Sequence, residues 1–213
     1  TLFGFEQAAD VRAENLVAGE RQITFDCISP RGTFPVVVPA PGKHNAYNAL
    51  AAIAVGLELG LTPAEINAGM ETFLPSAMRL HVELLGDYTV INDAYNASPM
   101  SMAAAAETLA AIAKGRKIAV LGDMLELGDV AVEAHRRVGE KLAEEGIQVL
   151  VTVGELAKHI AEAALESGAD VTVSCQTHDE AQEALRKLMR PGDTILIKGS
   201  RGMKMETILA MFK

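Results

Sequence analysis

The sequence has 213 residues, of which 49 % are hydrophobic, and it carries a formal net charge of −9 at neutral pH. This composition is ample for a packed core, and it argues against a nucleic-acid partner because no segment carries a stripe of basic residues. Aromatic residues make up only 4 % and tryptophan is absent, so aliphatic residues and Met must fill the core, a mix that suits helices packed on a buried sheet.

No apolar run is long enough to predict a transmembrane helix, so we expect no membrane partner. The N-terminal residues lack a basic region followed by an apolar run, which argues against a signal peptide. Cys27 and Cys175 lie in stretches without a metal-binding or redox spacing, and we interpret them as reduced thiols of a cytoplasmic protein.

The first third of the sequence predicts antiparallel strands followed by two helices. Short β-type runs separated by Gly19 and by Pro30-Arg31-Gly32 indicate strands joined by tight turns. Ala and Leu are then spaced to bury one helical face, and Thr62, Pro63 and Glu65 supply a capping box for a second helix. The expected strands are Val11–Leu16, Gln22–Ile28 and Thr33–Val38, and the expected helices run from Asn45 to Gly60 and from Thr62 to before Pro75.

From residue 80 onward the pattern changes to alternating strands and helices. Gly86-Asp87 indicates a leading hairpin, and the later strands are continuous apolar runs. This alternation predicts an α/β fold with a mostly parallel sheet, preceded by a smaller α+β piece, with the boundary near residues 75–80. The expected strands are His81–Leu85, Tyr88–Asn92, Lys117–Leu121, Val149–Val153, Val171–Ser174 and Thr194–Ile197. The expected helices run from Ser98 to Gly115, over Val130–Glu145 and Glu155–Glu166, from Thr177 to Pro191, and after Ser200. Thr177 and Glu180 predict a second capping box at the start of the fourth of these helices.

Four segments follow the carboxyl ends of predicted strands, where open parallel sheets bind ligands. They are Asp93–Pro99, Gly122–Gly128, Gly154-Glu155 and Lys198–Gly202. The carboxylate of Asp93 suits a pair of ribose hydroxyls, because it accepts two hydrogen bonds. The alternative is an ordinary turn in which Ser98 caps the next helix.

Charged residues in two of these segments suit a zwitterionic substrate. Lys198 and Arg201, with backbone N–H groups at a helix start, can hold an anion or a carboxylate, unless they are solvated cations of an ordinary turn. Asp123 and Glu126 can hold a substrate ammonium group, although capping and solvation of the loop explain them equally well.

Two further candidates lie outside these loops. Asn45 and Asn48 are three residues apart and share a helical face, and their amides suit an adenine edge or a phosphate. Capping of the helix by Asn45 is the alternative. Arg79 stands near the expected boundary, where a guanidinium can clamp a phosphate, although a plain surface arginine explains it too.

Several motifs are absent from the sequence. It has no Gly-x-x-x-x-Gly-Lys-Ser/Thr run, no Gly-x-Ser-x-Gly run and no zinc-ligand spacing of its histidines. It therefore predicts no P-loop, no serine-hydrolase elbow and no metal site of its own. We interpret His135 and His159, each on a predicted helix, as structural or solvated.

In their residues and in their order along the chain, the candidate motifs resemble those of the Mur ligases, a family of ATP-dependent ligases. Gly42-Lys43-His44-Asn45, with Asn48 and the apolar residues after it, resembles the start of the last helix of their central domain, and Met78-Arg79 resembles the arginine that follows. Three further stretches are similar to the members that add D-alanyl-D-alanine: Asn92–Met102, Leu121–Gly128 and Lys198–Arg201. The resemblance covers essentially the whole chain.

The resemblance implies an ATP- and Mg²⁺-dependent ligase that extends UDP-N-acetylmuramoyl-tripeptide through an acyl phosphate, in cytoplasmic peptidoglycan synthesis. It implies that residues 1–77 are the C-terminal part of the central ATP-binding domain and residues 78–213 the Rossmann-like C-terminal domain. The UDP-binding domain, the P-loop and the metal ligands have no counterpart here, so we expect the chain alone to be inactive. We also expect a monomer.

Carried over residue by residue, the resemblance implies a nucleotide site in which Arg79 is the catalytic phosphate clamp and Asp93 the ribose acceptor. The nucleotide contacts would be Asn45, Asn48, Arg79, Asp93, Tyr95 and Asn96. The expected D-alanyl-D-alanine contacts are Lys198, Ser200, Arg201 and Asp123. Two alternatives stay open: another Mur-type or folylpolyglutamate-type ligase, and a nucleotide- or peptide-binding module without chemistry of its own.

Overall fold

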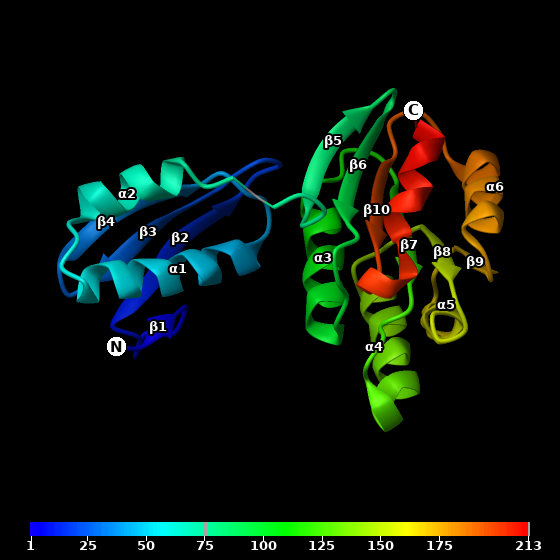
Figure 1. Cartoon of the computed structure of the whole chain (residues 1–213), viewed down its shortest axis with the longest axis horizontal. Coiled ribbons are helices and arrows are strands. Elements are labelled where there is room, and N and C mark those ends of the chain that lie inside the picture. Colours follow the sequence, from blue (N-terminus) through cyan, green and yellow to red (C-terminus); the bar gives the residue numbers. More distant parts are fainter. Residues whose placement is uncertain (75, 213) are drawn as a thin grey trace. The chain divides into compact units, whose positions relative to one another are not determined.

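The structure is a computed structural model that describes residues 1–74 and 76–212. The chain forms two compact units, Thr1–Pro75 and Ser76–Lys213 (Figure 1). Each unit has its own hydrophobic core and is described by itself.

The first unit holds a four-stranded sheet in the order β1-β2-β3-β4. Its strands are β1 (Phe3–Gly4), β2 (Val11–Ala18), β3 (Ile23–Ser29) and β4 (Gly32–Val38). The three predicted antiparallel strands are confirmed. β1 pairs parallel to β2 and was not predicted, because two residues are too few for a periodic pattern.

Two helices, α1 (Lys43–Glu58) and α2 (Pro63–Glu71), complete the core of the first unit. Alternate residues of the strands, such as Phe25 on β3 and Val36 on β4, are buried with Leu50 and Ile53 of α1. The predicted capping box of α2 is present in full, because the Thr62 hydroxyl accepts from Glu65 N and the Glu65 carboxylate accepts from Thr62 N.

The second unit is built on a six-stranded sheet in the order β5-β6-β10-β7-β8-β9. Its strands are β5 (His81–Leu85), β6 (Tyr88–Asp93), β7 (Lys117–Gly122), β8 (Val149–Val153), β9 (Val171–Cys175) and β10 (Thr194–Lys198). β5 and β6 form the predicted hairpin, and every other pairing is parallel. The predicted α/β class with a mostly parallel sheet is therefore confirmed.

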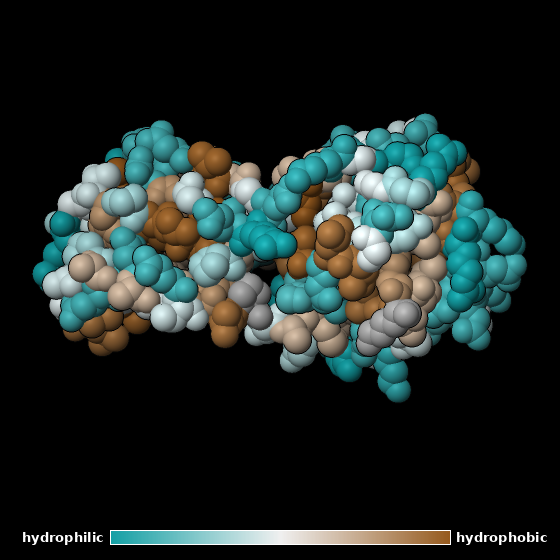
Figure 2. Space-filling model, turned by 90° about the horizontal axis from the view of Figure 1, so that it is seen from above, coloured by the Kyte–Doolittle hydropathy of each residue, from teal (hydrophilic) through white to brown (hydrophobic). Residues whose placement is uncertain are grey.

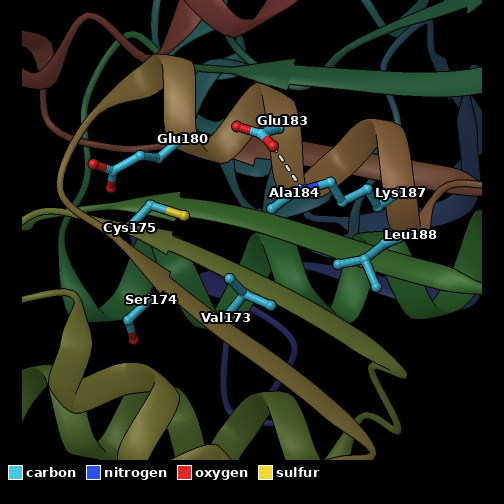
Figure 3. A pocket seen from close by; sticks show the side chains of 8 residues that line it. All are labelled: Val173, Ser174, Cys175, Glu180, Glu183, Ala184, Lys187 and Leu188. Carbon is cyan, nitrogen blue, oxygen red and sulfur yellow. Dashed lines mark hydrogen bonds and ion pairs between the residues drawn. The ribbon is translucent and has the colours of Figure 1, made fainter.

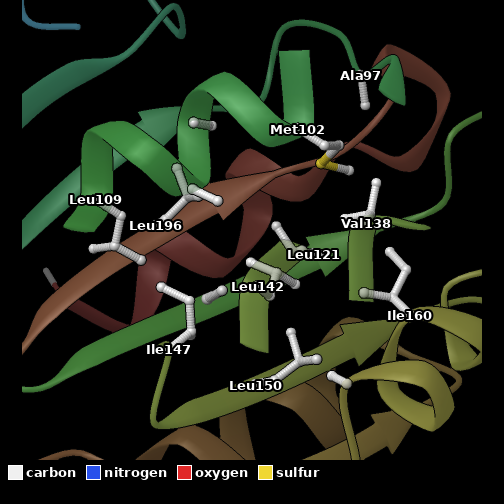
Figure 4. Packing of buried hydrophobic residues seen from close by; sticks show 14 of the residues in the cluster. Ala97, Met102, Leu109, Leu121, Val138, Leu142, Ile147, Leu150, Ile160 and Leu196 are labelled. Carbon is white, nitrogen blue, oxygen red and sulfur yellow. The ribbon is translucent and has the colours of Figure 1, made fainter. Parts of the chain in front are cut away.

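Helices cover both faces of this sheet (Figure 1). They are α3 (Pro99–Ile112), α4 (Ala131–Glu144), α5 (Lys158–Glu166) and α6 (His178–Leu188), with short 3-10 helices η1 (Gly128–Val130), η2 (Arg201–Met203) and η3 (Met205–Phe212). Leu196 on β10 packs into the cluster under α3, α4 and α5 (Figure 4), whereas its neighbours Ile195 and Ile197 pack into the cluster with α6 and η3. This alternation explains why the strands are apolar throughout.

Helices α4 and α5 approach each other closely at Gly139. A Cβ atom at this position would lie 2.2 Å from the carbonyl oxygen of Ile160 and 2.8 Å from the backbone nitrogen of Ala164. Glycine is therefore required at this crossing, because any side chain would push the two helices apart.

The structure corrects three local predictions in the second unit. The final helix is η3, which is 3-10 in form. The helix expected to start at Glu155 starts at Lys158. At α6, Thr177 accepts from Glu180 N as predicted, but the Glu180 carboxylate accepts from the backbone nitrogen of Gln176, one residue before the N-cap, so the capping box is incomplete.

The outer side of α6 is hydrophilic, since only Ala181 and Leu185 of this helix are buried. This side forms the hydrophilic right-hand edge of the second unit in Figure 2. Among the described residues, no helix combines the length and the apolar character that crossing a membrane requires.

Candidate active site

Three of the predicted loops meet at one edge of the six-stranded sheet. They follow β6, β10 and β7, which are neighbours in the sheet. Lys198, the last residue of β10, is in register with Asp93 at the end of β6 and with Leu121 near the end of β7. Because the three strands are parallel, their carboxyl ends place the loops side by side, as expected for a ligand site in an open α/β sheet.

Asp93 and Lys198 form a buried ion pair at the centre of this edge. Lys198 Nζ lies 2.6 Å from Asp93 Oδ2, and it also donates to the carbonyl oxygen of Asn96 at 2.8 Å. The Leu80 backbone N–H donates to Asp93 Oδ1 at 3.0 Å. Lys198 is only 2 % exposed, so its charge is compensated inside the protein rather than by water.

The exposed side chain of Arg79 is held beside the same loop. Its guanidinium lies over the ring of Tyr95, 4.2 Å from the ring centroid, a cation–π contact. The Tyr95 N–H donates to the Met78 carbonyl oxygen at 3.1 Å. Met78 and Leu80, on either side of Arg79, have φ angles of 63° and 46°. Such left-handed conformations are strained for non-glycine residues and persist where surrounding contacts impose them, often at functional sites.

Hydrogen bonds also join the loop after β7 to the turn after β10. The Ser200 N–H donates to the Asp123 carbonyl oxygen at 3.0 Å, and the Leu125 N–H donates to Ser200 Oγ at 2.9 Å. The Asp123 carboxylate accepts from the backbone nitrogens of Leu156 and Ala157, at 3.1 and 2.6 Å, and so caps the start of the α5 region. Asp123 therefore already has a structural function in this arrangement.

The sequence matches two domains of one enzyme family. Residues 78–201 match the domain described as Mur ligase, glutamate ligase domain, and residues 1–56 match the Mur ligase middle domain. The chain belongs to the Mur ligase family. The family predicted from the motifs is thus confirmed.

Similar proteins within the family carry a more specific name. A UDP-N-acetylmuramoyl-tripeptide–D-alanyl-D-alanine ligase of Bacillus subtilis is 37 % identical over 203 residues, which cover 94 % of this chain and 44 % of that protein. The crystal structure of MurF from Acinetobacter baumannii superposes with a TM-score of 0.88 at 34 % identity, over 99 % of this chain and 46 % of that one. This Mur ligase chain thus spans less than half the length of the relatives that it matches.

A MurF ligase of Thermotoga maritima, solved in complex with ADP, has the same fold. It superposes with a TM-score of 0.82 at 23 % identity and covers 99 % of this chain and 47 % of that one.

The first unit of this Mur ligase chain holds the two predicted asparagines on α1. Asn45 Nδ2 donates to the Pro41 carbonyl oxygen at 2.7 Å, and Asn48 Nδ2 donates to Asn45 Oδ1 at 3.3 Å. The helix N-cap is Gly42, which makes no side-chain cap, so capping by Asn45 is wrong as an explanation. The two amides form one polar pair on the first turns of α1, as their spacing predicted.

Arg201 is the exposed cation of the turn after β10 in this Mur ligase. Its Nη1 forms an ion pair with Glu206 Oε1 at 2.8 Å, and the side chain remains 54 % exposed. Among the described residues, no group of three or more His, Cys, Asp or Glu side chains is arranged to hold a metal ion.

A shallow pocket of about 430 Å³ lies away from these loops, between α6 and β9 (Figure 3). Glu183 and Lys187 form an ion pair of 2.6 Å on its rim. Its lining residues are Val173, Ser174, Cys175, Glu180, Glu183, Ala184, Lys187 and Leu188. None of them is among the predicted site residues, so the pocket is not the predicted ligand site.

His135 is a structural residue of this Mur ligase, in agreement with one of the two interpretations of the sequence, but its contact with the loop after β7 was not predicted. The side chain is 0 % exposed, and its Nε2 accepts from the Met124 N–H at 2.9 Å, within the loop after β7. The signal was available, because His135 lies on the same helical stripe as the apolar Val138 and Leu142. A histidine on a buried face must find hydrogen-bond partners there.

Proposed function

We propose that this chain supplies nucleotide and amino-substrate contacts of an ATP-dependent ligase that adds D-alanyl-D-alanine to UDP-N-acetylmuramoyl-tripeptide. The observation that carries the proposal is the 37 % identity, over 94 % of the chain, to a B. subtilis ligase that bears this name. The loops at the ends of β6, β7 and β10 support it, because they place cations and carboxylates at one sheet edge.

We assign the two parts of the chain to two domains of the Mur ligases. Residues 1–77 are the C-terminal part of the central ATP-binding domain, and residues 78–213 are the C-terminal domain. The sequence holds no P-loop, so this chain alone does not catalyse the reaction. Mg²⁺ would bind together with the triphosphate of ATP and would neutralise part of its charge. Among the described residues, no cluster of His, Cys, Asp or Glu offers a set of metal ligands.

The reaction needs an activated acid and a well-placed amine. The tripeptide carboxylate attacks the γ-phosphate of ATP, which gives an acyl phosphate and releases ADP. The amine of D-alanyl-D-alanine then attacks the acyl carbon, loses a proton and forms the amide as phosphate leaves. Both steps demand neutralisation of phosphate charge and alignment of the reactants. We propose the cytoplasm as the site of this reaction, because ATP and the UDP-linked precursor are both substrates.

The nucleotide contacts are Asn45 and Asn48 in the first unit and Arg79, Asp93, Tyr95 and Asn96 in the second. Arg79 suits the phosphate, because its guanidinium is exposed and the backbone groups of its two neighbours, Met78 and Leu80, are hydrogen-bonded. Asp93 suits the ribose. Each of its oxygens accepts one hydrogen bond within the protein, and a carboxylate oxygen can accept two.

The dipeptide contacts are Lys198, Ser200, Arg201 and Asp123. Arg201 is the exposed cation for the dipeptide carboxylate. Lys198 has three N–H donors, of which Asp93 and Asn96 take two, so one remains for the substrate. The second oxygen of the Asp123 carboxylate is the candidate acceptor for the ammonium group.

An NMR titration of the 213-residue chain tests this proposal, because it detects weak binding. D-alanyl-D-alanine is added with and without an ATP analogue, and L-alanyl-L-alanine, diaminopimelate and glutamate serve as controls. We expect shifts at residues 198–202 that are selective for the D,D-dipeptide. A selective response to glutamate or diaminopimelate would instead indicate another Mur-type or folylpolyglutamate-type ligase.

If the chain responds to the ATP analogue but to none of the amino compounds, even in a longer ligase, a nucleotide-binding module without chemistry of its own would be favoured. If no amino compound binds, the same titration on a longer ligase that contains this chain decides whether the missing domains are needed. Size-exclusion chromatography with light scattering checks the expected monomer.

A further inference from the structure

The buried ring of His135 connects α4 to the loop after β7. His135 Nδ1 lies 2.6 Å from the carbonyl oxygen of Ala131, one turn earlier on the same helix. A carbonyl oxygen only accepts, so Nδ1 carries the proton. Nε2 is then the acceptor for the Met124 N–H at 2.9 Å. Both contacts are satisfied by one neutral tautomer and by no other.

The loop that His135 holds in turn fixes Ser200. Leu125, the residue after Met124, donates its N–H to Ser200 Oγ, and the Ser200 N–H donates to the Asp123 carbonyl oxygen. The Ser200 oxygen is thus engaged as an acceptor, and its hydroxyl proton is left to be donated. Such a donor, next to the exposed Arg201, suits a carboxylate.

We propose that His135 is a positioning residue for the amino-substrate site: its unprotonated Nε2 holds the Gly122–Gly128 loop, and through Leu125 it orients the Ser200 hydroxyl as a donor to the substrate carboxylate. The identity of that substrate rests on the proposed function. The connection from His135 through Met124 and Leu125 to Ser200 does not, since it is made of contacts within the protein.

The ring must stay neutral for this arrangement to hold. Burial lowers the pKa of His135, the bond to Ala131 and the charge of Asp123 after β7 raise it, and His159 on α5 lowers it. The balance keeps the ring neutral at neutral pH. A protonated Nε2 would direct its N–H at the Met124 N–H, two donors facing each other, and the loop would be released.

Two matched substitutions separate the loop contact from the helix contact. In His135→Gln the amide oxygen reaches the place of Nε2 and can accept from Met124. In His135→Asn the shorter amide reaches only the place of Nδ1, so it can donate to Ala131 but leaves Met124 without an acceptor. Both variants remove the imidazole, so a general effect of losing the ring is common to both.

Amide exchange and ligand titration on the 213-residue chain give the test. We expect His135→Gln to retain slow exchange at Met124 and Leu125 and to bind D-alanyl-D-alanine within about threefold of the parent. His135→Asn should exchange about tenfold faster at both amides and bind the dipeptide about tenfold more weakly. Binding of an ATP analogue is the control and should differ little between the two variants.

A measurement on the unsubstituted chain covers the case in which the variants do not fold. We expect ring ¹⁵N shifts that report a proton on Nδ1, and we expect the amide shifts of Met124, Leu125 and Ser200 to titrate with the same midpoint as the His135 ring. The proposal would be overturned by a proton on Nε2 or by amide shifts that do not change when the ring titrates. Equal amide exchange and dipeptide binding of the Gln and Asn variants would also overturn it.

If these amides follow His135 but no dipeptide binds even in a longer ligase, the proposed substrate fails while the positioning contact stands. If the dipeptide binds the parent and both variants equally, the substrate stands and the positioning role fails.

Discussion

Lys198 and Asp93 are 105 positions apart in the sequence, yet their side chains form a buried ion pair of 2.6 Å across the adjoining ends of β10 and β6. Removal of one partner leaves the other charge buried without compensation. The pair therefore ties the two strand ends together and also determines which donors and acceptors remain for a ligand.

Lys198→Met and Asp93→Asn should each lower the free energy of unfolding by roughly 3 to 5 kcal/mol, because each leaves a buried partner unmatched. The double variant should recover part of this loss. Urea unfolding followed by circular dichroism gives the coupling energy, and strictly additive single effects would contradict the pairing.

Asp93→Asn also tests the ribose assignment in a longer ligase that contains this chain. We expect a raised KM for ATP, because the amide has one acceptor oxygen where the carboxylate has two. Steady-state kinetics with each substrate varied in turn provide the measurement. If only the KM for the dipeptide rose, Asp93 would belong to the other half of the site.

Arg79→Ala should lower kcat of a longer ligase by about 100-fold or more, since it removes a cation proposed to stabilise phosphate charge in the transition state. The stability of the second unit should change little, because the side chain is exposed. Arg137→Ala, which removes an exposed arginine paired with Glu133 on α4, is the matched control. An unchanged kcat would exclude Arg79 from the site.

The stability of the second unit should depend on pH through His135. Its pKa in the folded chain lies below the ordinary value of 6.5, chiefly because of burial. The unfolded chain therefore binds more protons in the window below pH 6.5, and the unfolding free energy must fall as the pH is lowered through that window. Urea unfolding at pH 7.5, 6.5 and 5.5 checks this, and the His135→Gln variant should lack this contribution.

Cys27 should resist thiol reagents in the folded chain. It is fully buried, and burial raises the pKa of its thiol to about 11. At pH 8 only about one molecule in a thousand would carry the reactive thiolate even without steric protection. Iodoacetamide labelling should therefore need urea. Rapid modification of Cys27 in the native chain would show that the first unit opens easily.

Gly139→Ala should destabilise the second unit by about 1 to 3 kcal/mol, because the new Cβ would meet the backbone of α5 at 2.2 Å. The neighbouring Glu140→Ala, on the exposed side of α4, should change the stability by no more than about 0.5 kcal/mol. Thermal unfolding of both variants gives the comparison. A neutral Gly139→Ala would mean that the two helices separate at low cost.

Features that depend on nearby residues were predictable from the sequence. The capping box of α2 joins Thr62 to Glu65, three positions later, and it forms as predicted. The hairpin at Gly86-Asp87 and the apolar strands also depend on short-range patterns, and they are present. The carboxyl ends of the parallel strands then indicated which loops would lie together.

Features that depend on distant residues were not predictable. Asp123 caps Leu156 and Ala157, which lie 33 and 34 positions away, and no local pattern indicates these partners. The pattern around Lys198 indicated a cation but did not indicate that Asp93, 105 positions earlier, would pair with it inside the protein. In both cases the side-chain direction is set by tertiary packing, which a local pattern does not contain.

The position of β10 has a consequence for how the protein is made. β10 follows the other five strands of this sheet in the sequence but lies between β6 and β7 and pairs with both of them. Until residues 194–198 leave the ribosome, the nascent chain holds two partial sheets, each with an open edge that can pair with other chains. Folding of the second unit must therefore wait until β10 has been synthesised, when this one strand pairs with both open edges.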